Sequence, residues 1–194
     1  HFGVPLHVQI HTDFLDPAFS RHSLLNKIRV KIARFVLRRA KGIRVVSARI
    51  RDSIQKSGIA IAAPITVLPM YVDLARIKAL PPSETLRARF QRFSSRVLVV
   101  SRLESEKGVM TALRAFADGA PESACLIIVG EGSGLAELLK LVRERQLESR
   151  VFFEGGAEAA PYYHLADLVL VPSEYEGFGL VIAEALSMGK PVIS

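Results

Sequence analysis

The chain has 194 residues, of which 49% are hydrophobic, so it is long enough to bury one large core or two modest ones. Its single cysteine, Cys125, excludes an internal disulfide, and it has no apolar run near the roughly 20 residues that cross a bilayer. The net charge of +7 is unevenly divided, since residues 1–92 hold 17 Lys/Arg and 5 Asp/Glu (+12) and residues 93–194 hold 9 and 14 (−5), which indicates two functional surfaces.

The first half alternates strand-like and helix-like segments as far as a proline-rich stretch. Apolar periodicity predicts strands at residues 5–10, 43–46 and 65–68 and helices at 24–40 and 48–57. Pro69, Pro81 and Pro82 then interrupt the regular pattern. Because prolines at such spacing break both helices and strands, we expect a domain junction in this stretch.

The second half repeats the alternation more clearly. Strands are predicted at 96–100, 124–129, 151–153 and 168–171, and helices at 109–117, 135–145, 159–165 and 180–188. The strands are continuous Val/Ile/Leu runs, as expected when both sheet faces are covered. The alternation predicts an α/β fold with parallel sheets and right-handed crossovers. The chain opens on His1 and stops within a strand-like segment, so we expect it to be an internal fragment of a longer protein.

Two loops that follow strands of the second half contain residues with binding chemistry. Arg102 and Lys107 flank the loop 101–108, and an Arg fork with a Lys at a helix start can hold a diphosphate. The alternative is a pair of surface cations, neutralised by Glu104 and Glu106. The turn Gly130-Glu131-Gly132-Ser133-Gly134 brings its third glycine one position early for a dinucleotide fingerprint, and taken alone it is a tight turn.

A pair of glutamates eight positions apart is the most informative feature. Glu176 lies in a glycine-rich strand-to-helix loop, and Glu184 lies inside the following helix. Alone, Glu184 is a solvated helix residue and Glu176 a helix cap. However, the three loops all follow strands of one predicted parallel sheet and therefore share its carboxyl edge, where open α/β sheets bind ligands.

Two further features lie in the first half. His11-Thr12-Asp13 ends the first strand, and a lone histidine there is either structural or part of a site. A basic segment, residues 21–56, combines cations with an apolar stripe. It is either an amphipathic helix packed on a sheet or an attachment to an anionic membrane. No aromatic stacking pattern accompanies these cations, so we expect no nucleic-acid partner.

These residues resemble the nucleotide-sugar glycosyltransferases of family 4, the glycosyl transferases group 1. The similar motifs are Ser101-Arg102-Leu103, Lys107-Gly108, Gly130-Glu131-Gly132, Phe153-Glu154-Gly155, Pro172-Ser173, Glu176-Gly177-Phe178-Gly179-Leu180, Glu184-Ala185 and Gly189-Lys190-Pro191-Val192. His11-Thr12-Asp13 looks like the histidine region of the family's acceptor domain. The segment Met70-Tyr71-Val72-Asp73 departs from the family, which usually has Asn-Gly-Val-Asp there.

The resemblance implies a GT-B fold, with parts of two Rossmann-like domains. Residues 1–80 would be the C-terminal part of the N-terminal, acceptor-side domain, and residues 81–95 the interdomain junction. Residues 96–194 would be most of the C-terminal, nucleotide-sugar-binding domain, truncated at its end.

The resemblance also implies roles for individual residues. Arg102 and Lys107 would bind the donor diphosphate, Glu176 the hydroxyls of the transferred sugar and Glu184 the ribose, with His11 near the reacting sugar. The remaining donor-binding positions would be Gly130, Glu131, Gly132, Gly155 and Gly177, together with Phe178, Gly179 and Leu180, whose backbone amides would hold the phosphates.

The implied activity is that of a retaining, hexosyltransferase-type enzyme in polysaccharide, glycolipid or related glycoconjugate synthesis. The resemblance implies no cofactor other than the nucleotide-sugar donor, and we see no metal-ligand spacing. The acceptor would be a glycan, a lipid-linked molecule or a small molecule. The expected location is cytoplasmic, with peripheral contact to the inner face of the membrane, and these 194 residues alone are expected to be inactive.

Two other functions remain open from the residues. Glycoside hydrolases also use paired carboxylates, about 5–10 Å apart, although cations and helix amides suit a diphosphate better than a neutral glycoside. The chain is alternatively a peripheral membrane-binding module with a degenerate sugar site.

Overall fold

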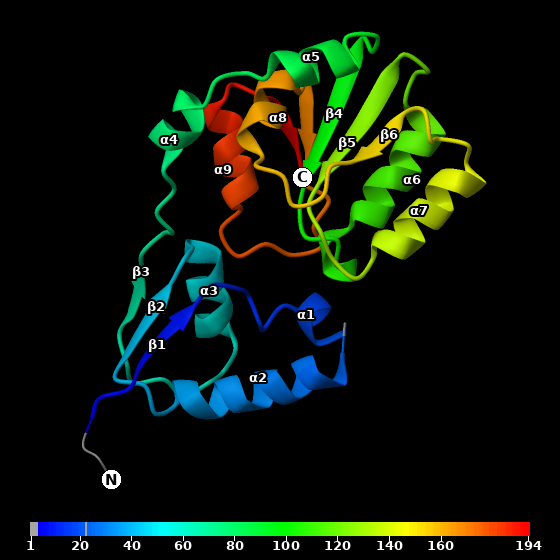
Figure 1. Ribbon diagram of the computed structural model, residues 1–194. Helices are drawn as coiled ribbons and strands as arrows, with labels where there is room; N and C mark the ends of the chain where they lie inside the picture. Colours follow the sequence, from blue (N-terminus) through cyan, green and yellow to red (C-terminus); the bar gives the residue numbers. More distant parts are fainter. Residues whose placement is uncertain (1–3, 22) are drawn as a thin grey trace. The chain divides into compact units, whose positions relative to one another are not determined.

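The computed structural model describes residues 4–21 and 23–194 (Figure 1). The chain divides into two compact units. The first runs to Tyr71 and also includes Tyr175–Gly179, and the second comprises the remaining residues from Val72 onward. Each unit contains one parallel sheet with helices packed on it. The α/β fold class predicted from the sequence is therefore confirmed.

The first unit is built on a three-stranded parallel sheet in the order β1-β2-β3. Its elements are β1 (His7–Ile10), α1 (Pro17–Arg21), α2 (Leu24–Leu37), β2 (Gly42–Val45), α3 (Ala48–Lys56) and β3 (Ile65–Val67). Because strand side chains alternate between faces, Ile10, Ile43 and Val45 point into one core with Ile50 and Ile54 of α3. The predicted strands and the two longer helices of this half are confirmed to within a few residues.

Helix α2 buries little of its apolar side. Its buried residues are Asn26 and Leu37, whereas a set that we call the α2 apolar stripe is 54–77% exposed: Leu24, Leu25, Ile28, Ile32 and Phe35. The helix has 14 residues and is therefore about 21 Å long, and the stripe runs along most of that length. Among the described residues, no helix has both the length and the apolar character to cross a membrane.

The second unit contains a five-stranded parallel sheet in the order β6-β5-β4-β7-β8. Its strands are β4 (Ser95–Val100), β5 (Ala124–Val129), β6 (Val151–Phe153), β7 (Leu168–Leu170) and β8 (Val192–Ile193). Its helices are α4 (Leu74–Ala79), α5 (Glu84–Phe90), α6 (Val109–Gly119), α7 (Leu135–Glu144), α8 (Ala160–Leu165) and α9 (Leu180–Ser187), with the short 3₁₀ helix η1 (Ser105–Lys107) before α6.

Strand β5 explains why this sheet is apolar on both faces. All six of its residues are buried. Cys125, Ile127 and Val129 face a core that includes residues of α5, α8 and α9, whereas Leu126 and Ile128 face a second core with α6 and α7 (Figure 1). A continuous apolar run is thus the sequence of a strand with helices on both sides, as predicted.

Residues 81–95, which the sequence suggests as a junction, belong to the second unit. They contain α5, whose first turn is capped by the Ser83 hydroxyl accepting from the Leu86 amide at 3.2 Å. Phe90 of α5 is fully buried. Its ring lies edge-on to the ring of Phe152, with 5.0 Å between the ring centroids. Pro81 and Pro82 directly precede this capped helix, and the boundary between the two units lies earlier, between Tyr71 and Val72, within the proline-containing stretch.

Candidate functional site

The loops at the carboxyl edge of the second sheet are tied together by backbone hydrogen bonds. The loop after β4 is joined to the turn after β5, because Leu103 donates to the Glu131 carbonyl and accepts from Gly134, both at 2.8 Å. Gly130 in turn donates to the Gly155 carbonyl at 2.7 Å. The sharing of one edge, predicted from the parallel sheet, is therefore confirmed for the loops after β4 and β5, and the loop after β6 joins them. Residues Tyr175–Gly179 of the third predicted loop belong to the first unit.

Two glycines permit this close approach. Gly130 has φ 143°, and a Cβ there would overlap the Ser101 carbonyl oxygen. Gly108 has φ 65°, and its Cβ would overlap the Pro172 carbonyl oxygen, in the segment that follows β7. Only glycine combines these backbone angles with such short separations. The glycines of the motifs thus join neighbouring loops, which a simple tight turn does not require.

The two predicted diphosphate ligands lie on this edge. The side chain of Arg102 is 68% exposed and pairs with the Glu106 carboxylate at 3.3 Å. Lys107 ends η1, directly before Gly108, which is the N-cap of α6. An ion pair this exposed is weak, so the Arg102 guanidinium can exchange Glu106 for a more highly charged anion.

Glu104, one of the two acids in the alternative interpretation, is hydrogen-bonded to Ser133, and the charge of Arg102 also acts on it. Its carboxylate accepts from the Ser133 hydroxyl at 2.8 Å and from the Ser133 amide at 3.1 Å. These two hydrogen bonds hold the pKa of Glu104 below its ordinary value. Glu104 therefore fixes the glycine turn after β5 to the loop after β4. This role was not predicted, because 29 residues separate the partners.

Glu131 makes a similar link to the next loop. Its carboxylate oxygen Oε1 accepts from the Gly156 amide at 3.1 Å. Gly155, beside it, has φ 61°, and Gly132 lies directly against the backbone of Leu103. The predicted nucleotide-contacting positions Gly130, Glu131, Gly132 and Gly155 therefore form one connected surface across three loops.

Glu184 is held by a buried tyrosine. It lies in the second turn of α9, which begins at Leu180. The hydroxyl of Tyr163, on α8, donates to Glu184 Oε2 at 2.8 Å, and Tyr163 is 1% exposed. Burial, together with the Glu184 charge, raises the pKa of Tyr163 far above its ordinary range, so the hydroxyl remains a donor. Tyr163 was not predicted.

The first unit brings His11 together with the loop of Glu176. Gly177 packs against the carbonyl of His11, so closely that no side chain fits there. Arg49 of α3 donates to the Glu176 carbonyl oxygen at 2.7 Å, and Phe178 packs on the core of this unit. Arg49 is a further residue of this region that the sequence did not single out.

The predicted residues thus form two sets, one in each unit. The first set contains His11, Glu176, Gly177, Phe178 and Gly179, and the second contains Arg102, Lys107, Gly130, Glu131, Gly132, Gly155, Leu180 and Glu184. Asp13, next to His11, is structural, because its buried carboxylate accepts from Ser53 Oγ at 3.0 Å. Within residues 4–21 and 23–194, no cluster of three or more His, Cys, Asp or Glu side chains could hold a metal ion.

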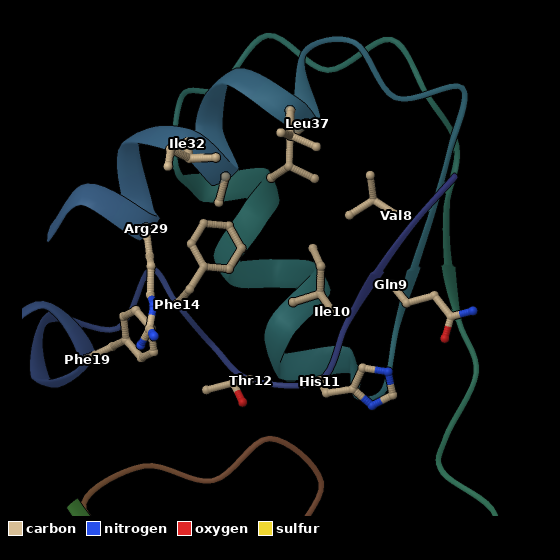
Figure 2. Close-up of a pocket in the computed structure, with 12 residues that line it drawn as sticks. Val8, Gln9, Ile10, His11, Thr12, Phe14, Phe19, Arg29, Ile32 and Leu37 are labelled. Carbon is tan, nitrogen blue, oxygen red and sulfur yellow. The ribbon is translucent and has the colours of Figure 1, made fainter. Parts of the chain in front are cut away.

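An apolar hollow of about 480 Å³ lies beside these residues in the first unit. Figure 2 shows Ile10, Phe14 and Leu37 between α2 and β1, and Arg29 and Phe19 also line the hollow. The lining is almost entirely apolar, so the hollow suits an apolar group better than a sugar or a phosphate.

The motif surface of the second unit is matched by a family model. Residues 88–194 match the model described as glycosyl transferases group 1. The chain belongs to this family. It is 30% identical to the 2-deoxystreptamine glucosyltransferase of Streptomyces kanamyceticus, with 98% of this chain and 52% of the relative covered.

Two further comparisons agree. The chain is 36% identical to a GDP-mannose-dependent phosphatidylinositol monomannoside mannosyltransferase of Mycobacterium tuberculosis, over 84% of this chain and 47% of the relative. Among solved structures, Anabaena HepE in complex with UDP and glucose is similar with a TM-score of 0.80 and 28% identity, over 97% of this chain and 52% of that one. The fold is therefore of the GT-B type, and the chain spans about half the length of these relatives.

Proposed function

We propose that the full-length protein transfers a hexose from a nucleoside-diphosphate sugar to an acceptor, with retention of anomeric configuration. The observation that supports this best is the connected edge of the second unit. Arg102 and Lys107 lie on a loop that glycine contacts join to its neighbours, and Glu184 lies on α9, where Tyr163 holds it. Membership of the glycosyl transferases group 1 and the UDP in the HepE structure support a nucleotide-sugar donor.

The proposed mechanism follows from the charge that develops during transfer. As the nucleoside diphosphate leaves, negative charge grows on its phosphate oxygen. Arg102, Lys107 and the amides at the start of α9, from Leu180, would stabilise that charge, because the first amides of a helix have no acceptor within the helix. Removing one such donor costs on the order of 10² to 10³ in rate.

Three other residues take the roles that the resemblance implies. Glu176 would accept hydrogen bonds from the hydroxyls of the transferred sugar, and His11 would lie near the reacting carbon. Glu184 would accept from the ribose hydroxyls. Neither glutamate is proposed as the nucleophile of a hydrolase, since the cations and helix amides of this edge favour a diphosphate.

Calorimetry with the full-length protein tests this proposal. Wild type should bind UDP or GDP, and Arg102→Ala should weaken that binding by about tenfold or more, which corresponds to about 1.4 kcal/mol. Arg143→Ala is the matched control, because Arg143 lies in the last turn of α7, away from the carboxyl edge. Absence of nucleotide binding to the wild type would refute the transferase proposal.

We also propose that the α2 apolar stripe contacts an anionic membrane surface at the cytoplasmic face. The stripe is exposed, and Lys27, Lys31, Arg34 and Arg38 follow one flank of it at helical spacing. Exposed apolar side chains beside cations are the pattern of an interfacial helix. The name of the mycobacterial relative includes a lipid, phosphatidylinositol, which supports a membrane-associated acceptor for this protein. A glycan or a small molecule is the alternative acceptor.

Vesicle co-sedimentation tests the membrane contact. Reversing Arg34, Arg38 and Arg39 to Glu should lower binding to anionic vesicles by about a hundredfold, given about 1 kcal/mol for each cation near the surface. Reversing the same number of cations at Arg87, Arg114 and Arg143 should have little effect. Unchanged binding of the first variant, or binding that salt does not weaken, would contradict the proposal.

A further inference from the structure

Two adjacent tyrosines of α8 hold two different glutamates. Tyr162 donates its hydroxyl to Glu154 Oε2 at 2.8 Å, and Tyr163 donates to Glu184 Oε2 at 2.8 Å. Both side chains are buried, at 6% and 1% exposure. Both pairs join a tyrosine hydroxyl of the same helix to a carboxylate, although Glu154 Oε2 also accepts from Arg89 at 2.8 Å. They differ in which carboxylate they orient, because Glu154 follows β6 and Glu184 lies on α9.

The hydrogen bond from the Tyr163 hydroxyl to Glu184 is strongly favoured. A buried hydroxyl without a partner is costly, and a carboxylate is the strongest acceptor that it can find. The phenol ring has only two side-chain torsions, and the core around it fixes both. Tyr163 is therefore a rigid donor at one end of the pair.

The helix that presents Tyr163 is itself anchored. His164 Nε2 lies 2.8 Å from the Leu80 carbonyl oxygen, and Lys190 Nζ donates to the His164 carbonyl at 3.2 Å. Glu184, by contrast, has a flexible side chain on a partly exposed helix face. The rigid partner in the pair therefore sets the orientation of the flexible one.

We propose that Tyr163 is the positioning residue for Glu184: it engages Oε2 and so turns the carboxylate, with its second oxygen Oε1, toward the two ribose hydroxyls of the donor. This inference rests on the proposed role of Glu184 in the donor site. Two vicinal hydroxyls match a carboxylate well, because both can donate to its oxygens. Without the Tyr163 hydroxyl, the carboxylate loses its fixed orientation and with it the preference for a ribose.

The test compares UDP with dideoxy-UDP, which lacks both ribose hydroxyls, on the full-length protein by calorimetry. If the wild type prefers a guanine nucleotide, GDP and dideoxy-GDP are used. Wild type should bind the ribose form about tenfold or more tightly, as expected for hydrogen bonds to a charged acceptor. Tyr163→Phe should reduce that preference to about threefold or less. Its affinity for the dideoxy form should stay within about twofold of the wild type.

Tyr162→Phe is the matched control. It removes the same hydroxyl from the same helix but acts on Glu154, so the preference for the ribose form should remain. In a Glu184→Ala background, Tyr163→Phe should cause no further loss of preference, because the two residues act through one contact.

The outcomes separate the two proposals. If the wild type shows no preference for ribose, the assigned role of Glu184 fails. If the wild type prefers the ribose form, two results for Tyr163→Phe overturn the positioning role of Tyr163. One is an unchanged preference for the ribose form, and the other is an equal loss of affinity for both nucleotides.

A second measurement applies if Tyr163→Phe does not fold. Fluorotyrosine at position 163 keeps the hydroxyl, and its ¹⁹F resonance should shift on binding UDP and much less on binding dideoxy-UDP. Equal shifts with both nucleotides, or no shift with UDP while it binds, would also overturn the positioning role.

Discussion

Replacing Gly130 by alanine is the sharpest test of how the donor edge is built. The added Cβ would overlap the Ser101 carbonyl oxygen, and the backbone angle φ of 143° is one that side chains rarely adopt. Because Ser101 begins the loop that holds Arg102, the two loops must move apart or the backbone must change its angles. Either response breaks the contact that connects the glycine turn to the diphosphate loop.

The magnitude follows from these two effects. A strained backbone angle costs about 1–3 kcal/mol, and overpacking a rigid neighbour costs about 1–3 kcal/mol. We therefore expect Gly130→Ala to lower the free energy of unfolding by about 2–6 kcal/mol. Two controls separate the effects. Gly189→Ala tests strain alone, since Gly189 has φ 69° with open space around it, and Gly119→Ala introduces no close contact and no positive φ.

The assay is urea denaturation of the full-length protein followed by circular dichroism, with UDP calorimetry on the same variants. Gly119→Ala should stay within about 0.5 kcal/mol of the wild type. Gly189→Ala should lose about 1–2 kcal/mol with unchanged UDP affinity, and Gly130→Ala should lose both stability and affinity. If Gly130→Ala matched the wild type in both measurements, the glycine contact would not organise the edge.

Three further predictions concern a surface ion pair, the core and the sugar. Burial raises the pKa of Asp167, but hydrogen bonds from Arg96 outweigh it and hold that pKa below its usual value. Asp167→Asn should therefore have a lower free energy of unfolding than the wild type near pH 7, and the difference should close as the pH falls below about 4. A difference that did not change with pH would argue against this. Phe90→Ala should lose about 3–5 kcal/mol in urea denaturation, whereas Phe35→Ala, on the exposed stripe, should lose under about 1 kcal/mol; equal losses would contradict the packing described. Glu176→Ala should lower turnover by about 10² to 10³ while nucleotide affinity stays unchanged, and near-wild-type turnover would exclude it as the sugar ligand.

Much of the fold was predictable because single strands already contain the information. The run from Ala124 to Val129 is apolar at every position, which only a strand covered on both faces requires. The loops could be assigned to one edge because parallel strands end on the same side. The strongest local signals, such as Gly130 after β5 and Gly177 before α9, fell at positions where backbones approach closely.

The misses have a common physical cause, which is that the decisive partners are distant in the chain. The hydrogen bonds of Glu104 to Ser133 were not predicted, because 29 residues separate the two. Tyr163 gave no signal because its partner, Glu184, is 21 residues away. The sequence left open whether helix α2 packs on a sheet or attaches to a membrane, and the structure leaves its apolar stripe exposed.

The hydrogen bonds between loops have a consequence for the engineering of donor choice. A graft that replaced only the turn around Gly130 would remove the carboxylate of Glu131 from Gly156 and the hydroxyl of Ser133 from Glu104. The loops after β4 and β6 would then lose these hydrogen bonds, although their own sequences were unchanged. The loops of this edge therefore support one another, and specificity swaps between relatives should exchange the loops after β4, β5 and β6 together.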